Sequence, residues 1–168
     1  MKLLIEKAQN LRQLYINQVR MLLSAEEQIL KGLEKMRDAA TDIQLQEAFQ
    51  SHRQETKVHV TRLKNILTHT AGEVDDTKCK TIAALIHEGE ELIHECDGTL
   101  RDVALIAAAQ RIEHYEIAAY GALRSFAKCL DLEGEADDLN QTLQEEGHAD
   151  QLLSGISDRL NAQAATLP

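Results

Sequence analysis

The sequence predicts an all-α protein, built as an antiparallel bundle of four long helices with a fifth, shorter helix in the crossover connection. Two observations predict this fold. The 168 residues are rich in Ala, Leu, Glu and Gln, which favour helices, and poor in the aromatic residues that favour strands. The only proline is Pro168, so no proline interrupts the long stretches of helical periodicity. A chain of this length can bury a substantial core, and we expect a single domain over 1–168.

The first two predicted helices, at about 2–38 and 41–70, form one hairpin. In both segments apolar residues recur at helical spacing, which places them on one side of each helix. Thr41 or Asp42 can cap the second helix, because a short side chain with an oxygen accepts a hydrogen bond from a free backbone N–H there. The connection is therefore short, and the two helices are expected to run antiparallel.

The remaining segments, at about 78–96, 100–130 and 136–161, predict a short helix and then a second long hairpin. Gly72 can end the helix before them, and the stretches "DGT" and "DLEGEA" separate the later helices. The segment 100–130 is apolar nearly all round, which indicates a helix that is covered on more than one side. The short helix is expected to lie in the connection between the two hairpins.

Charge and hydropathy exclude several classes of partner. The net charge is −10 and no basic patch is present, which disfavours nucleic acid and anionic membrane surfaces but is compatible with cations. No apolar run approaches the ~20 residues of a membrane span, and Glu6 and Lys7 interrupt the run at the N-terminus. The three cysteines are widely spaced and form no zinc pattern, which indicates packing thiols in a reducing cytoplasm.

Acidic residues fall on the apolar faces of the four long helices, where core residues are expected. A helix turns ~100° per residue, so each side chain can be placed relative to the centre of its apolar stripe. Glu26 and Glu146 lie within ~30° of those centres, whereas Glu55 and Asp150 lie at the edges, ~60–70° away. The carboxylates found in this way are Glu26, Glu55, Glu113, Glu116, Glu146 and Asp150, and His52 and His59 lie on the stripe of the second helix.

These acids are expected to meet at one height in the bundle. Glu26 and Glu55 are 29 residues apart and lie at nearly equal distances from the first turn. Glu116 and Glu146 are 30 residues apart and lie at nearly equal distances from the second turn. At ~1.5 Å per residue, both pairs therefore fall near the middle of their helices.

Several ionised carboxylates cannot share an apolar interior without partners, because burial costs several kcal/mol per charge and repulsion adds to it. They must be protonated, paired with Lys or Arg, or bound to cations. The inward positions offer histidines but almost no Lys or Arg, and two divalent cations would offset four charges. Glu and His suit iron or manganese better than structural zinc, and their arrangement is typical of ferritin-like di-iron or di-manganese bundles.

Each of these residues also has a simpler interpretation. A lone acid at a helix edge is usually solvated, and His59 could be a histidine satisfied within the core. His52 and His114 are more often packing residues or outer partners of a metal site. The literal Glu-x-x-His pair is Glu145 with His148, but His148 points ~140° from the stripe, so Glu146 and Asp150 are the stronger pair.

Four stretches of the sequence resemble the ferritin-like stress proteins of the YciE/YciF type: "RDVALIAAAQRIEHYEIAAYGAL", "SAEEQILKGLEKM", "FQSHRQETKVHVTRL" and "LNQTLQEEGHADQLL". The resemblance implies a ferritin-like bundle, a di-metal carboxylate centre, a homodimer and a bacterial stress context. By position it implies the ligands Glu26, Glu55, Glu113, Glu116, Glu146 and Asp150, with His59 beside them. Asp150 stands where the ferritin motif has His, and such an oxygen-rich site shifts preference toward hard ions.

The first hypothesis is therefore a cytoplasmic protein that holds two divalent metal ions per chain, iron before manganese, and oxidises Fe(II) with dioxygen or peroxide. Such a protein would be a ferroxidase- or peroxidase-like di-iron oxidoreductase. The alternative is a non-catalytic structural or interaction protein, a helical dimer whose metal site only stabilises the bundle. A third hypothesis is iron storage within a shell of many copies.

Overall fold

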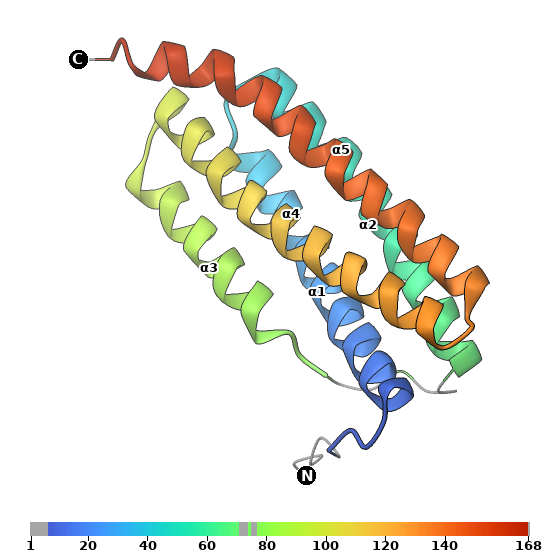
Figure 1. Cartoon of the computed structure of the whole chain (residues 1–168). Coiled ribbons are helices and arrows are strands. Elements are labelled where there is room, and N and C mark those ends of the chain that lie inside the picture. Colours follow the sequence, from blue (N-terminus) through green and yellow to red (C-terminus); the bar gives the residue numbers. More distant parts are fainter. Residues whose placement is uncertain (1–6, 71–73, 75–76, 168) are drawn as a thin grey trace.

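The computed structural model describes residues 7–70, 74 and 77–167, and over these residues it contains five helices and no strand. They are α1 (Leu11–Ala39), α2 (Ile43–Thr70), α3 (Lys80–Glu95), α4 (Gly98–Cys129) and α5 (Glu133–Ala164). Helices α1 and α2 pack along each other, as do α4 and α5, and contacts of α1 with α4 and of α2 with α5 close the bundle (Figure 1). The predicted all-α, ferritin-like bundle is confirmed.

The shorter helix α3 lies in the connection between the two hairpins, as predicted, and packs on α4 and α1 (Figure 1). Helix α4 is consequently covered by α5, α3 and α1. This explains why its sequence is apolar nearly all round, because three of its sides face other helices.

Helix α1 begins later than the predicted residue 2. Residues 7–10 are not helical, and the helix begins at Leu11. Asn10 has an extended backbone, and its side-chain oxygen accepts a hydrogen bond from the backbone N–H of Gln13 at 2.9 Å. An asparagine in this position is a strong start signal that overrides the apolar spacing before it. The earlier part of the prediction, residues 1–6, lies outside the described residues.

The turn between α1 and α2 is tied to the second hairpin by Asp102, a buried residue of α4. Its carboxylate accepts hydrogen bonds from the backbone N–H groups of Thr41 and Asp42, at 2.7 and 2.9 Å, and from the Thr41 hydroxyl at 2.6 Å. Asp42 caps α2 as expected, because its side chain accepts from the N–H of Leu45 at 3.1 Å. The turn is therefore fixed both to its own helix and to α4.

The other helix ends differ from prediction by a few residues. Only Cys96 and Asp97 separate α3 from α4, and Gly98 has φ +53°, a conformation that favours glycine. Helix α5 begins at Glu133, inside the predicted "DLEGEA" turn, because the chain already reverses at residues 130–132. The predicted stop at Gly72 lies outside the described residues.

Polar side chains are buried at the middle of the bundle, between apolar layers. With the exception of Asp102, they come from the central turns of α1, α2, α4 and α5, as the matched spacings predicted. They are Glu26, His52, Thr56, His59, Glu113, Glu116, Thr142 and Glu146. The fold thus brings four carboxylates and two histidines into one dry region.

Candidate metal centre

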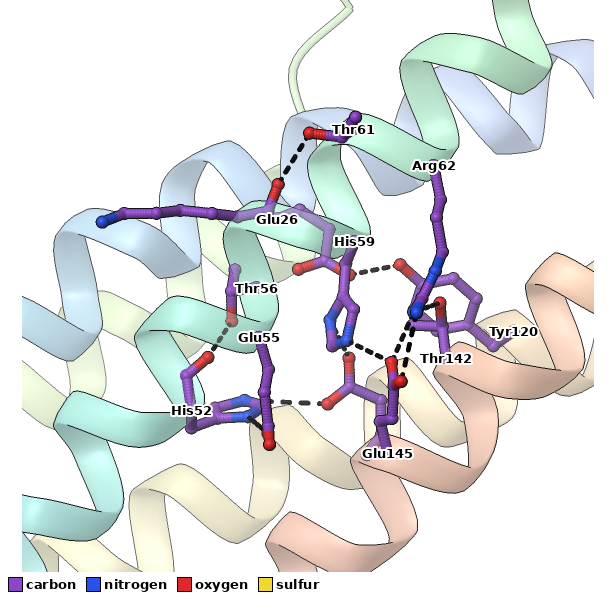
Figure 2. A network of polar contacts seen from close by, with 12 residues as sticks. Glu26, His52, Glu55, Thr56, His59, Thr61, Arg62, Tyr120, Thr142 and Glu145 are labelled. Carbon is purple, nitrogen blue, oxygen red and sulfur yellow. Dashed lines mark hydrogen bonds and ion pairs between the residues drawn. The ribbon is translucent and has the colours of Figure 1, made fainter.

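The central cluster receives its carboxylates from three helices and its histidines from the fourth. Glu26 on α1, Glu116 on α4 and Glu146 on α5 are 0% exposed, and Glu113 on α4 is 2% exposed. Glu113 and Glu116 are three residues apart, so they share one face of α4. Helix α2 contributes His52 and His59 to the cluster (Figure 2). They are seven residues apart and therefore also share one face of their helix.

These residues form two overlapping groups. In the first, one side-chain atom each of His52, Glu113, Glu116 and Glu146 lies within 4.8 Å of the others. In the second, the same holds for Glu26, His59 and Glu146. Glu146 belongs to both groups, so the two groups share one carboxylate.

Each histidine turns one ring nitrogen toward two carboxylates of the cluster. Nε2 of His52 lies 3.2 Å from Oε1 of Glu113 and 3.6 Å from Oε2 of Glu146. Nδ1 of His59 lies 2.9 Å from Oε1 of Glu146 and 3.6 Å from Oε1 of Glu26. Nitrogen and oxygen donors therefore converge on the same small volume from four helices.

The opposite nitrogen of each ring faces an outer carboxylate. Nδ1 of His52 is 3.6 Å from Oε2 of Glu55, and Nε2 of His59 is 3.0 Å from Oε2 of Glu145. Glu145 is in turn held by both terminal nitrogens of Arg62, of which Nη2 donates to Oε1 at 3.1 Å (Figure 2). Metal-binding histidines commonly use their second nitrogen in this way, which fixes the ring orientation.

The buried carboxylates have oxygens that accept no hydrogen bond. These atoms are Oε2 of Glu26, Oε2 of Glu113, and both oxygens of Glu116 and of Glu146. An unsatisfied buried acceptor costs about 1–3 kcal/mol, and more when it carries charge. Divalent cations would satisfy these oxygens and balance their charge, so the donor set fits a metal that prefers oxygen and imidazole ligands.

The surroundings shift the pKa values of the cluster so that it retains protons. Burial, reinforced by the neighbouring charge of Glu146, raises the pKa of Glu26 and of Glu116, and burial also raises the pKa of Glu113. Burial alone would lower the pKa of His52 and of His59, but the facing carboxylates outweigh it and raise both values. A cation entering the cluster would therefore displace protons.

Tyr120 is the tyrosine that contacts the cluster. It is buried, and its O–H donates a hydrogen bond to Oε1 of Glu26. Burial and the nearby carboxylates raise the pKa of Tyr120 well above 10, so it remains a protonated donor. Tyr15 instead donates to Glu135 at 2.8 Å, and Tyr115 contacts Cys79.

Two of the expected ligands, Glu55 and Asp150, do not join either group. The Glu55 side chain is 45% exposed and contacts His52 from outside. The Asp150 side chain is 18% exposed, accepts from Nε2 of Gln110 at 3.0 Å and lies 3.6 Å from His114. Both residues lie at the edges of the inward faces of their helices. At such a position the side-chain rotamer determines whether the carboxylate points into the bundle or toward its surface.

The structure adds His52 and Arg62 to the residues that the sequence indicates. The sequence alone favours a packing or outer role for His52, but His52 lies directly in the cluster, and its spacing of seven from His59 is the sequence signal for this. Arg62 contacts Glu145, which lies 83 residues later in the sequence, and no local sequence pattern predicts this contact. His114 is 68% exposed and His148 is also exposed, so the literal pair of Glu145 with His148 is not formed in the cluster.

No helix in the described part of the chain is long and apolar enough to cross a membrane.

Comparison with known proteins places the chain among ferritin-like helical proteins. It is 36% identical to Protein YciF of Escherichia coli K12 over 136 residues, which are 80% of this chain and 82% of that protein. The crystal structure of the E. coli stress protein YciF matches with a TM-score of 0.88 and 32% identity, covering 92% of this chain and 99% of that one. YcfI of Rhodopseudomonas palustris matches with a TM-score of 0.85 and 33% identity, covering 89% and 96%.

A family model described as "Domain of unknown function (DUF892)" matches residues 10–166, which include all five helices and the whole cluster. The chain therefore belongs to the DUF892 family.

Proposed function

We propose that this protein is a bacterial ferritin-like protein that binds two divalent metal ions per chain, iron before manganese, and oxidises Fe(II) with dioxygen or hydrogen peroxide. The observation that carries the proposal is the pair of buried groups that share Glu146 and leave carboxylate oxygens without hydrogen bonds. The description of E. coli YciF as a stress protein supports a role in stress protection, where free iron and peroxide must be limited.

One ion would be held by Glu26, His59 and Glu146, and the other by His52, Glu113, Glu116 and Glu146, with Glu146 belonging to both groups. Glu55 contacts His52 from outside, and the assignments of Glu55 and Asp150 as ligands stay predictions. A site made of Glu and His without Cys suits ions that change oxidation state while keeping oxygen ligands.

When bound, two Fe(II) ions would supply the two electrons that, with two protons, reduce hydrogen peroxide to two waters or dioxygen to hydrogen peroxide. The carboxylates of Glu26, Glu113, Glu116 and Glu146 would offset the positive charge of the metal, and His52 and His59 would add nitrogen ligands. The apolar core residues around the cluster would limit access of water to it.

The proposal includes a homodimer in the cytoplasm, as the family resemblance implies. The free thiols of Cys79, Cys96 and Cys129 are compatible with a reducing compartment. The net charge of −10 disfavours nucleic acid as a partner.

A second candidate is a non-catalytic structural protein in which the cluster only holds the bundle together. The contacts of His59 with Glu146 at 2.9 Å and of His52 with Glu113 at 3.2 Å favour it, because protonated histidines can balance buried carboxylates without a metal. The two candidates differ in one property: only the first oxidises Fe(II) at the cluster.

The deciding experiment is an anaerobic Fe(II) titration of the untagged protein, followed by exposure to oxygen or peroxide. The proposal predicts about two Fe(II) bound per chain, followed by oxidation that is recorded by absorbance. Glu116→Ala combined with Glu146→Ala is expected to abolish binding while helicity by circular dichroism persists. The control is Asp137→Ala with Asp158→Ala, which removes two exposed acids from α5 and should bind iron normally. Iron binding that survives the Glu116/Glu146 change would contradict the proposed site.

A further inference from the structure

An apolar hollow runs from the surface toward the cluster between α1, α3 and α4. Its outer part, of about 10 Å³, begins beside the exposed ion pair of Lys35 with Glu90. Its inner part, also of about 10 Å³, has Glu113 of the cluster among its lining residues. The two parts share the lining residues Gly32, Met36, Ile86 and Ile112 and are therefore neighbours.

Two glycines line this hollow. A Cβ atom at Gly32 on α1 would lie 3.4 Å from Cγ1 of Ile86 on α3, which is van der Waals contact. A Cβ atom at Gly89 on α3 would lie 3.5 Å from Cβ of Ala108 on α4. The space that the missing side chain of Gly32 leaves is part of the hollow, so a methyl group there would occupy it.

The chemistry of the lining selects what can enter. The charged lining residues are Lys35 and Glu90 in the outer part and Glu113 in the inner part. The other lining residues have no polar side chain; they are Ile29, Gly32, Leu33, Met36, Leu85, Ile86, Gly89, Ile93, Ala108, Ala109 and Ile112. Water or hydrogen peroxide would lose hydrogen bonds on entering, because a buried polar molecule needs two to four polar partners. A small apolar molecule loses none.

Size narrows the choice further. Each part has about the volume that one water-sized molecule requires, so only diatomic or similarly small molecules fit. At the inner end lies Glu113, which is 2% exposed and whose Oε2 accepts no hydrogen bond. The passage thus ends on a residue of the metal cluster and not in a closed apolar void.

We propose that this hollow is the route by which dioxygen reaches the cluster. The inference rests on the proposed function and deepens it, because it names dioxygen, and not peroxide, as the oxidant that this hollow between α1, α3 and α4 admits. Helix α3, which is the short helix of the crossover, then has a function of its own as one wall of the passage.

The first test is binding of dioxygen itself, which needs neither metal nor activity. We expect a dioxygen molecule between Gly32, Ile86 and Ile112 in a crystal of the full chain under dioxygen pressure. Gly32→Ala should remove that molecule. The control is Gly155→Ala on α5, where an added Cβ meets no atom within 4 Å and the same gain in helix propensity applies. Absence of bound dioxygen from the unmodified protein would overturn the proposal.

The second test compares oxidants on the iron-loaded protein by stopped-flow absorbance. Gly32→Ala should slow oxidation by dioxygen several-fold, leave oxidation by peroxide unchanged, and leave Fe(II) affinity unchanged. Ile86→Val is the second variant, for use if Gly32→Ala does not fold. It removes one methylene from the lining and so widens the hollow, and it should therefore increase the rate of oxidation by dioxygen. Equal dioxygen rates in all variants would overturn the route while the metal chemistry stands. Failure of the unmodified protein to bind iron would instead count against the proposed function, and the crystal under dioxygen pressure would still decide whether the hollow admits dioxygen.

Discussion

At the scale of single residues, the informative feature is His59, which lies between two carboxylates on opposite ring nitrogens. Glu145 lies 3.0 Å from Nε2, and Glu146 lies 2.9 Å from Nδ1. A neutral imidazole has one N–H donor and one lone pair. If Glu145, held by Arg62, accepts the proton of Nε2, the lone pair of Nδ1 faces the cluster and is available to a metal.

This arrangement predicts that Glu145→Gln weakens metal binding although Glu145 itself lies outside both groups. Loss of the outer carboxylate frees the ring of His59, and changes of this kind typically cost about 10- to 100-fold in metal affinity. Isothermal titration with Fe(II) or Mn(II) measures the effect. Gln141→Ala is the control, because Gln141 touches the same carboxylate from the exposed side at 3.0 Å. An affinity unchanged in Glu145→Gln would refute the orienting role.

The sequence predicted the positions of the buried acids better than those of the acids at the edges of the helix faces. Glu26, Glu113, Glu116 and Glu146 lie near the centres of their helix faces, where helical periodicity alone determines burial. Glu55 and Asp150 lie at face edges, where the choice depends on side-chain rotamers and on partners from other helices. A periodic pattern contains no information about either, so these two assignments stay predictions.

At the scale of helices and turns, Asp102 joins the two hairpins. Its buried carboxylate satisfies two backbone N–H groups and one hydroxyl at the turn between α1 and α2. Hydrogen bonds to a charged group contribute about 1.5–3 kcal/mol each, and donors left unsatisfied cost a similar amount. The link holds the end of the first hairpin against α4.

Asp102→Ala should therefore lower the free energy of unfolding by about 3 kcal/mol or more. Urea unfolding followed by circular dichroism measures it. Asp97→Ala serves as control, because the Asp97 side chain is 99% exposed and makes only a surface ion pair with Arg101, so its loss should stay within about 0.5 kcal/mol. Equal stability of the two variants would show that Asp102 does not anchor the turn.

Helix number, order and most helix ends could be predicted from periodicity and turn residues, but the starts of α1 and α5 could not. Helix α1 starts at Leu11, later than predicted, because Asn10 caps it. Helix α5 starts at Glu133, earlier than predicted, because the chain already reverses at residues 130–132. In both places a local hydrogen bond or backbone reversal decided the end, and apolar spacing does not report such interactions.

At the scale of the whole molecule, the cluster links stability to pH. In the metal-free protein the pKa values of Glu26, Glu113 and Glu116 are raised, and so are those of His52 and His59. At these five groups the folded state therefore binds more protons than the unfolded state. Stability is highest below the unfolded pKa values, and it falls as pH rises through the folded ones.

Metal-free protein should consequently lose thermal stability as pH rises from about 6.5 to about 9. Metal-bound protein should lose much less, because cations replace the protons and bind more tightly as these leave. Thermal unfolding at several pH values, with Mn(II) and with chelator, measures both curves. A gap between the curves that does not widen with pH would contradict the proton-retaining cluster.

The central claim is that two metal ions share one carboxylate, and metal stoichiometry tests it most directly. Elemental mass spectrometry after Fe(II) loading should give about two ions per chain in the unmodified protein. Glu26→Ala should reduce the number to about one, because Glu26 belongs to one group, whereas Glu146→Ala should abolish tight binding of both ions. No transition metal bound by the unmodified protein, or equal losses in the two variants, would contradict the shared site.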